Sequence, residues 1–131
     1  MIDQGRTVLI TGASAGIGKS FSEVFFRNGF NLVLTARRAE KLEAVKAELL
    51  KSSSNQSIHI ITSDLSDINA PQEIFNFCRE RNIRIDALVN NAGYGNPESF
   101  EMIPWDSHAA FLRVMVTAVT ELIHLFLPDM I

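Results

Sequence analysis

Short apolar runs alternate along this chain with longer stretches in which apolar residues recur at helical spacing. The apolar runs cover residues 7–10, 31–35, 58–62 and 87–89. Between them, stretches such as residues 39–51 and 71–82 place apolar side chains three or four positions apart, as amphipathic helices do. This strict alternation predicts an α/β fold, in which helices cover both faces of a parallel sheet.

The last helix is predicted to be long, from residue 105 to residue 127, and to stop at Pro128. One of its apolar stripes is expected to face the sheet, and it consists of Phe111, Met115, Ala118, Leu122 and Phe126. A second apolar face carries Val116, Val119 and Ile123, which a solvent-exposed helix should not have. We therefore expect the second face to be buried in a homo-oligomer.

Composition fits a single domain, residues 1–131, without a nucleic-acid or membrane partner. The net charge of −3 leaves no basic surface for nucleic acid or anionic lipid. Cys78 is the only cysteine, which predicts a buried thiol and a reducing environment. The first residues lack a signal-peptide pattern, and the most apolar stretch, residues 114–127, is short for a membrane span. A soluble, cytoplasmic chain is expected.

The strongest local feature is the glycine-rich segment 11–18, between the first strand and the first helix. It reads Thr-Gly-Ala-Ser-Ala-Gly-Ile-Gly, and the helix that follows has one apolar stripe formed by Ile17, Phe21, Val24 and Phe25. Glycine lets the backbone turn tightly and approach a pyrophosphate, while the helix N-terminus presents N–H groups and a partial positive charge. The segment therefore predicts dinucleotide binding.

The same segment also allows a phosphate loop of the Walker A type. Residues 13–20 nearly satisfy the pattern G-x-x-x-x-G-K-[ST], with Ala13 in place of the first glycine. In a P-loop NTPase, Lys19 would contact the phosphates and Ser20 would bind Mg²⁺. A partner aspartate should then follow an apolar strand directly, whereas Asp64 comes only after Ser63. The dinucleotide interpretation is favoured.

Two motifs together point to a family. Residues 11–18, followed by Asn-Asn-Ala-Gly at positions 90–93, resemble the classical short-chain dehydrogenase/reductase family over nearly the whole chain. The part that is similar is the N-terminal half of the family's domain. The resemblance implies a Rossmann-like doubly wound sheet, truncated after about four strands in the order 3-2-1-4. It also implies hydride transfer between NADP(H) and a carbonyl or alcohol substrate.

The resemblance further implies which positions bind the cofactor. The pyrophosphate would lie on Gly12, Gly16 and Gly18, with Ser14 and Ile17 also lining the loop. Asp64 and Leu65 match positions that meet the adenine ring. Asn90 matches a residue that ties the central strands together, and the neighbours of the cofactor would be Asn91, Ala92 and Gly93.

The end of the second strand predicts which nicotinamide cofactor is preferred. NAD-binding chains usually have an acidic residue there to bind the ribose hydroxyls. This chain has Ala36, followed by Arg37 and Arg38. An arginine binds a 2′-phosphate by charge-assisted hydrogen bonds, and a carboxylate would repel it. We expect NADP rather than NAD, with Arg37 as the first candidate ligand and Arg38 as the second.

No catalytic residue is predicted within these 131 residues. The family's Ser and Tyr-x-x-x-Lys would follow a fifth strand, beyond Ile131, and Tyr94, the only tyrosine, has no lysine four positions later. Met115 stands where the resemblance places an asparagine that supports proton transfer, and a thioether cannot organise a water chain. His59, His108 and His124 are scattered, so no metal site is expected.

The sequence thus favours the NADP-binding portion of a short-chain dehydrogenase/reductase, inactive as this chain alone. The alternatives are a non-catalytic NADP-binding or dimerisation module and, third, a P-loop NTPase.

Overall fold

The computed structural model describes residues 5–52 and 55–131, in which strands and helices alternate as predicted. Its first half contains β1 (Thr7–Thr11), α1 (Gly16–Arg27), β2 (Asn31–Ala36) and α2 (Ala39–Leu50). The second half contains β3 (Ile58–Thr62), α3 (Ala70–Glu80), β4 (Ala87–Val89) and a long helix beginning at Trp105. A single 3₁₀ turn, η1 (Phe100–Met102), interrupts the loop before that helix.

All strand pairs in the described sheet are parallel, and the strand order is β3-β2-β1-β4. The order predicted from the resemblance is therefore confirmed. Leu9 of β1 lies between Val33 of β2 and Leu88 of β4. β1 and β2 are buried, whereas all three residues of β4 are half-buried because this strand forms an edge of the sheet.

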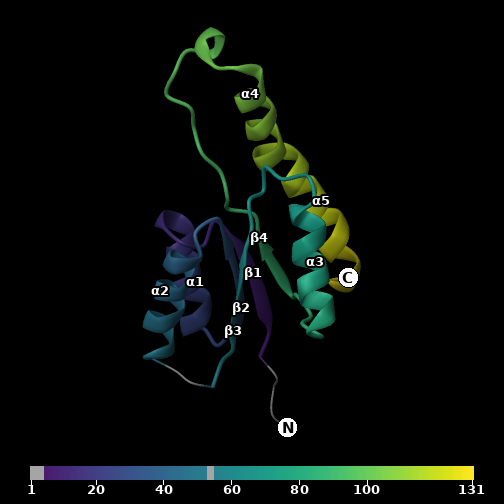
Figure 1. The fold of residues 1–131 in the computed structure, drawn as a ribbon. Coiled ribbons are helices and arrows are strands. Elements are labelled where there is room, and N and C mark those ends of the chain that lie inside the picture. The colour runs from purple at the N-terminus through teal and green to yellow at the C-terminus, as the bar shows by residue number, and fades with distance from the viewer. Residues whose placement is uncertain (1–4, 53–54) are drawn as a thin grey trace.

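Each face of the sheet carries its own hydrophobic core. Alternate residues of a strand point to opposite faces, so Leu9 and Val33 pack with α3 and α5, while Val8 and Leu32 pack with α1 and α2. Figure 1 shows these two helical layers on opposite sides of the sheet, with the long helix rising beyond the carboxyl ends of the strands. The predicted parallel sheet between two helical layers is confirmed.

The buried face of α1 is not its most apolar face. Gly18, Ser22 and Phe26 are the buried residues of this helix, and the Ser22 hydroxyl donates to the Gly18 carbonyl (2.9 Å). Ile17 and Val24 of the predicted stripe are exposed, at 70% and 47%. The apolar stripe faces outward because the first turn of α1 lies very close to the carboxyl end of β1. Only small residues fit between this turn and the sheet.

The last helix is continuous from Trp105 to Asp129, and a wide turn divides it. α4 (Trp105–Leu112) passes through a π-helical turn at Arg113–Thr117 into α5 (Ala118–Phe126), followed by a 3₁₀ turn at Leu127–Asp129 that includes Pro128. A π turn holds more residues than an α turn and shifts which side chains face inward. The 3₁₀ turn carries the helix to Asp129, slightly beyond the predicted stop at Pro128.

That shift corrects the predicted inward stripe of the helix. Val114 is buried in line with Ala118, Leu122 and Phe126, whereas Met115 is 39% exposed. The predicted stripe is thus right for its last three members and wrong for Met115. A regular 3.6-residue period cannot anticipate a π turn, because nothing in the hydrophobic pattern of residues 113–117 marks one.

The long helix also satisfies the length and composition of a membrane span. It has 25 residues, and an 18-residue window within it has a mean hydropathy of 1.7, so the stretch counted in the sequence was shorter than the helix that forms. This evidence is weak, since the core helix of a soluble protein meets the same criteria. Here one side of the helix packs on α3, with the Phe75 and Phe126 rings 5.2 Å apart in a T-shaped arrangement.

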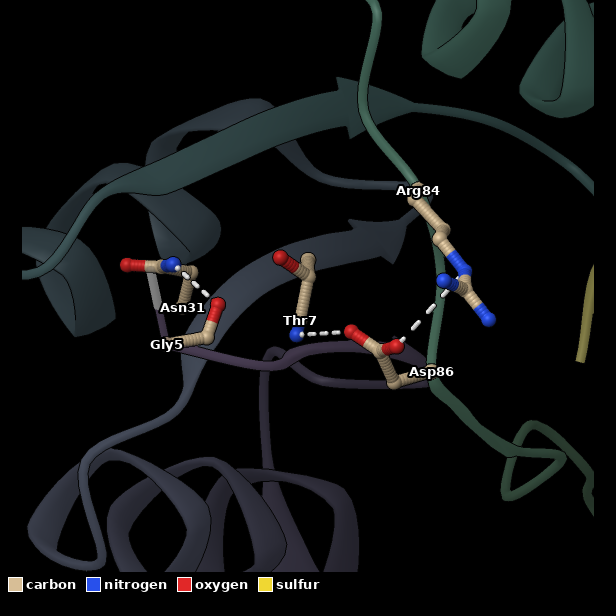
Figure 2. A network of polar contacts seen from close by, with 5 residues as sticks. All are labelled: Gly5, Thr7, Asn31, Arg84 and Asp86. Carbon is tan, nitrogen blue, oxygen red and sulfur yellow. Dashed lines mark hydrogen bonds and ion pairs between the residues drawn. The ribbon is translucent and has the colours of Figure 1, made fainter. Parts of the chain in front are cut away.

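A polar network fixes the amino ends of the central strands (Figure 2). The Asp86 carboxylate accepts a hydrogen bond from the Thr7 backbone N–H (2.9 Å) and lies 3.8 Å from the Arg84 guanidinium. The Asp86 N–H donates in turn to the Thr7 carbonyl (2.8 Å). On the other side, the Asn31 side chain donates to the Gly5 carbonyl (3.0 Å). These hydrogen bonds connect the amino ends of β1, β2 and β4 and thereby help to fix the register of the three strands.

Substitution D86A is expected to lower the free energy of unfolding by about 1–3 kcal/mol, because the Thr7 N–H loses its acceptor in a mostly buried position. Urea denaturation of the variant measures this loss. The matched control, R84A, should change stability by less than about 0.5 kcal/mol, since an exposed ion pair contributes little. Equal losses in the two variants would show that the ion pair, and not the backbone hydrogen bond, matters.

Candidate functional site

The carboxyl ends of the four described strands open onto one cavity of about 620 Å³. Its walls come from the loop after β1, the ends of β2 and β3, the segment after β4, and the long helix. In parallel α/β sheets, ligands bind at this edge. The structure brings these predicted cofactor positions to the cavity wall: Gly12, Ser14, Gly16, Ile17, Arg37, Arg38, Asp64, Leu65, Asn91, Ala92 and Gly93.

Gly18 is the predicted position that does not line the cavity. A Cβ added there would lie 2.0 Å from the Gly12 carbonyl oxygen, far inside any real contact. Gly12 is equally confined, because its φ is +64° and a Cβ would lie 2.9 Å from the Cα of Ala92. Gly16, with φ of +56°, has open space around it. Gly18 therefore serves close packing of α1 against the loop, while Gly12 and Gly16 shape the turn.

Asn91 connects the glycine loop to the end of β4. Its side-chain amide donates to the carbonyls of Thr11 (3.1 Å) and Gly12 (3.2 Å). The Thr11 hydroxyl oxygen accepts from the backbone N–H groups of Asn91 (3.0 Å) and Ala92 (2.9 Å). The side chain that ties the central strands is thus Asn91, which corrects the role expected for Asn90. The β4 strand ends one residue before Asn90, so the turn directs Asn91 back to β1.

Two arginines and one carboxylate line the cavity just after β2 and β3 end. Arg37 and Arg38 are exposed, and neither forms an ion pair within 4.0 Å among the described residues. Asp64 accepts hydrogen bonds from the Ser66 N–H (3.0 Å) and the Ser66 hydroxyl (2.7 Å). These bonds, helped by the positive charge of Arg37, lower the pKa of the Asp64 carboxyl below its ordinary value. Asp64 is therefore a fixed anion at neutral pH.

Sequence analysis missed several residues of the cavity wall. Thr35 and Ser63 precede the predicted Arg37 and Asp64 on neighbouring strands, so their position at strand ends was the available signal. Val114 enters the wall because of the π turn described above. Tyr94 also lines the cavity, and its ring packs edge-on against the Phe111 ring, with 5.4 Å between the ring centroids.

The Walker A interpretation is not supported by the position of its key residues. Lys19 and Ser20 do not line the cavity, whereas Ser14, Ala15 and Gly16 do. The Lys19 N–H donates to the Ala15 carbonyl, as in an ordinary first helical turn. A lysine that binds phosphates would instead extend over the loop.

The described residues contain neither a metal-ligand cluster nor a tyrosine–lysine pair. No group of three or more His, Cys, Asp or Glu side chains in residues 5–52 and 55–131 is arranged to hold a metal ion. Cys78 is buried as predicted, and burial raises the pKa of its thiol to about 11. Met115 lies against Gly93, since a Cβ there would come within 2.8 Å of the methionine sulfur.

The fold and the cavity define an α/β protein with a dinucleotide-type site at the carboxyl edge of its sheet. Residues 6–131 match the family model described as short chain dehydrogenase. The chain belongs to this family.

The relatives are longer than this chain. It is 30% identical to "Inactive hydroxysteroid dehydrogenase-like protein 1" of Rattus norvegicus, over 97% of this chain and 38% of the relative. It is 31% identical to the serine 3-dehydrogenase of Rhizobium radiobacter, over 95% of this chain and 49% of that enzyme. The chain thus spans half or less of the length of these curated relatives.

Solved structures agree with this assignment. A metagenomic short-chain oxidoreductase in complex with NADP superposes with a TM-score of 0.88 at 31% identity, over 96% of this chain and 57% of that one. A short-chain dehydrogenase from Sphingobium yanoikuyae in complex with NADPH gives a TM-score of 0.86 at 34% identity, over 94% of this chain and 48% of that one. Both likenesses extend over the whole described sheet.

Alanine substitutions at Gly18, Gly16 and Gly95 should change the stability of the chain by different amounts. G18A is expected to destabilise the chain by about 3 kcal/mol or more, because the new methyl group meets backbone atoms that cannot rotate away. G16A should cost about 1 kcal/mol, since only its left-handed backbone conformation is disfavoured. Thermal unfolding measures both. G95A is the control, since no atom lies within 4 Å of its added Cβ. Equal effects of G18A and G16A would contradict the close packing of α1.

Proposed function

We propose that this chain is the NADP(H)-binding portion of a short-chain dehydrogenase/reductase. The observation that carries the proposal is that one cavity is lined both by a glycine loop with a helix N-terminus and by two arginines, Arg37 and Arg38, that form no ion pair with a carboxylate of the described residues. Membership in the family agrees with a dinucleotide ligand.

The glycine loop and the N-terminus of α1 fit a pyrophosphate. Gly12 and Gly16 leave the backbone without side-chain cover, and a Cβ at Gly12 would close the turn. Ala15, at the N-cap of α1, gives no side-chain hydrogen bond to the first turn, and that turn has no acidic residue. The free N–H groups and the helix dipole are therefore available to an anion.

The segment that follows β2 favours NADP over NAD. β2 ends at Ala36, so no carboxylate occupies the position that would bind ribose hydroxyls and repel a phosphate. Arg37 and Arg38 follow directly and supply positive charge at the cavity wall. Two structurally similar relatives are described as complexes with NADP or NADPH, which supports the same choice.

The bound nicotinamide would supply or accept the hydride in carbonyl–alcohol interconversion, as the family implies. The residues of this chain would bind and orient the cofactor, and the Tyr94 ring would cover the adjacent loop. We propose that residues 1–131 alone bind NADPH without reducing carbonyl compounds. The placement of Met115 against Gly93 favours a non-catalytic binding module as the second candidate function, since the thioether offers no proton relay.

Substitution R37A is expected to weaken NADPH binding by about 10-fold or more, the loss typical of a charge-assisted hydrogen bond, and to leave NADH binding nearly unchanged. Titration of each nucleotide by fluorescence measures the two affinities. The control, R27A, removes an arginine at the opposite end of α1 and should change neither affinity. Equal weakening of both nucleotides by R37A would contradict a 2′-phosphate contact, and absence of NADPH binding by the wild type would contradict the proposed function.

We further propose that the exposed face of the long helix binds a second copy of the chain. Leu112, Val116, Ile123 and Leu127 are each between 43% and 56% exposed along this face. In a two-fold symmetric dimer this face of one copy would pack against the same face of the other copy. Apolar surface would then be removed from water on both copies. Relatives of this family pack the corresponding helix against another subunit, as the resemblance implies.

Substitution V116E/I123E is expected to convert a self-associated chain into a monomer, because two charges would be buried without partners in each half of the interface. Sedimentation velocity at several concentrations measures the change. V24E, which places a charge on the exposed face of α1, is the control and should leave the mass unchanged. A wild-type chain that stays monomeric and soluble at high concentration would contradict the proposed interface.

A further inference from the structure

The outer strand β3 presents a row of backbone groups at one edge of the sheet. In the described sheet β3 pairs only with β2. Their ladder starts where the Leu32 N–H donates to the Ser57 carbonyl (2.9 Å). It continues to the bond from the Ser63 N–H to the Ala36 carbonyl (2.9 Å). Backbone groups of successive residues point to opposite sides of a strand, so alternate residues bond to the same neighbour. The residues whose N–H and C=O groups point away from β2, here called the outward residues, are Ile58, Ile60 and Thr62.

The sequence of β3 suits pairing with another strand. It reads Ile-His-Ile-Ile-Thr, and β-branched residues of this kind favour strands. Many proteins protect an edge strand with a proline, a charged residue or a bulge within the strand. β3 contains no proline, Lys, Arg, Asp or Glu, and its register with β2 runs without a bulge from Ile58 to Thr62. The outward backbone groups are therefore suited to accept a further strand.

Positive charge flanks this edge from both helical layers. His59 of β3 lies against the Phe77 ring of α3, with 6.5 Å between the ring centroids. The Arg81 guanidinium carbon lies 3.7 Å from the centre of the same ring. Burial lowers the pKa of His59, and the positive charges of Lys46 and Arg81 lower it further. Because Lys46 belongs to α2 and Arg81 directly follows α3, the two cations approach the edge from opposite faces of the sheet (Figure 1).

The charge at this edge argues against pairing with a second copy of the chain. Two copies of β3 related by a two-fold axis would bring Lys46 and Arg81 of both copies together, and like charges across such an interface are destabilising. Glu80 lies 4.0 Å from Arg81, but both side chains are exposed, so this ion pair offsets little of the positive charge. A segment with acidic side chains has the complementary charge.

We propose that β3 binds an extended acidic segment of a partner protein, which adds a further strand to the sheet at this edge. Backbone hydrogen bonds to the outward residues supply the affinity, and carboxylates placed beside Lys46 and Arg81 supply the selectivity. The surface lies at the opposite edge of the sheet from β4, and neither cation lines the cofactor cavity. This interaction is therefore separate from nucleotide binding.

The first test compares two fluorescein-labelled peptides, Glu-Val-Glu-Val-Glu-Val-Glu and Lys-Val-Lys-Val-Lys-Val-Lys. Fluorescence anisotropy with the whole chain measures their affinities. We expect the acidic peptide to bind about 10-fold more tightly than the basic one at low ionic strength, and its binding to weaken as salt screens the charges. Equal affinities, or no binding of the acidic peptide, would overturn the proposal.

Hydrogen exchange measured by NMR locates the bound peptide. In the free chain the amides of the outward residues should exchange quickly, because they have no partner in the sheet, and binding of the acidic peptide should slow them. The amides of His59 and Ile61 point toward β2 and should exchange slowly in both states. If the peptide binds without protecting the outward amides, it lies elsewhere and the proposal is wrong.

Variants separate the charge from the backbone contribution. K46E/R81E should weaken binding of the acidic peptide by about 10-fold or more, whereas R27E, at the end of α1, should leave it unchanged. T62P removes one outward N–H at an exposed position and should weaken binding by about 5-fold, while T62V keeps that N–H and should bind like the wild type. Far-UV circular dichroism checks that each variant is folded. Unchanged affinity in both K46E/R81E and T62P, or an equal loss in R27E and K46E/R81E, would contradict the proposed site.

Discussion

The close approach of α1 to the end of β1 is the contact on which the rest of the site depends. Gly18 lies against the Gly12 carbonyl, at a distance that no side chain permits. This contact brings the N-terminus of α1 to the carboxyl edge of the sheet and leaves its N–H groups facing the cavity. The Asn91 side chain then bonds to the Thr11 and Gly12 carbonyls and fixes the segment after β4 to the same point. The contacts of Gly12, Gly18 and Asn91 therefore determine both the packing of α1 and the shape of the cavity wall.

The cavity wall combines three kinds of surface. The glycine loop offers backbone donors, Arg37 and Arg38 offer positive charge, and Leu65 with Val114 offers an apolar wall. Asp64 is ionised at neutral pH, as an aspartate ordinarily is, and hydrogen bonds from Ser66 lower the pKa of its carboxyl further. A nearby hydrogen-bond acceptor of this kind complements an amine on a base.

The surface of the long helix has three parts with different surroundings. Its inner side packs on the sheet and on α3, its first turns line the cavity, and its outer side exposes apolar residues such as Val116 and Ile123. The π turn at Arg113–Thr117 reconciles these demands by rotating Val114 inward. Met115 consequently turns toward Gly93, where its thioether occupies space beside the cavity. Since π turns are common at functional sites, this one marks where cavity and helix packing meet.

The sequence by itself determined the parallel α/β architecture, the glycine loop and the arginine pair after β2, because alternation, glycine spacing and charge are local properties of the chain. It misjudged Met115 and Asn90, and it did not reveal Thr35 or Ser63. Those positions depend on a helical irregularity, on the direction of a turn, and on the register between β2 and β3. Each of these arises from packing between segments far apart in the chain. Only the tertiary structure could decide which polar side chains are buried beside the cavity, because burial is a property of neighbours and not of sequence position.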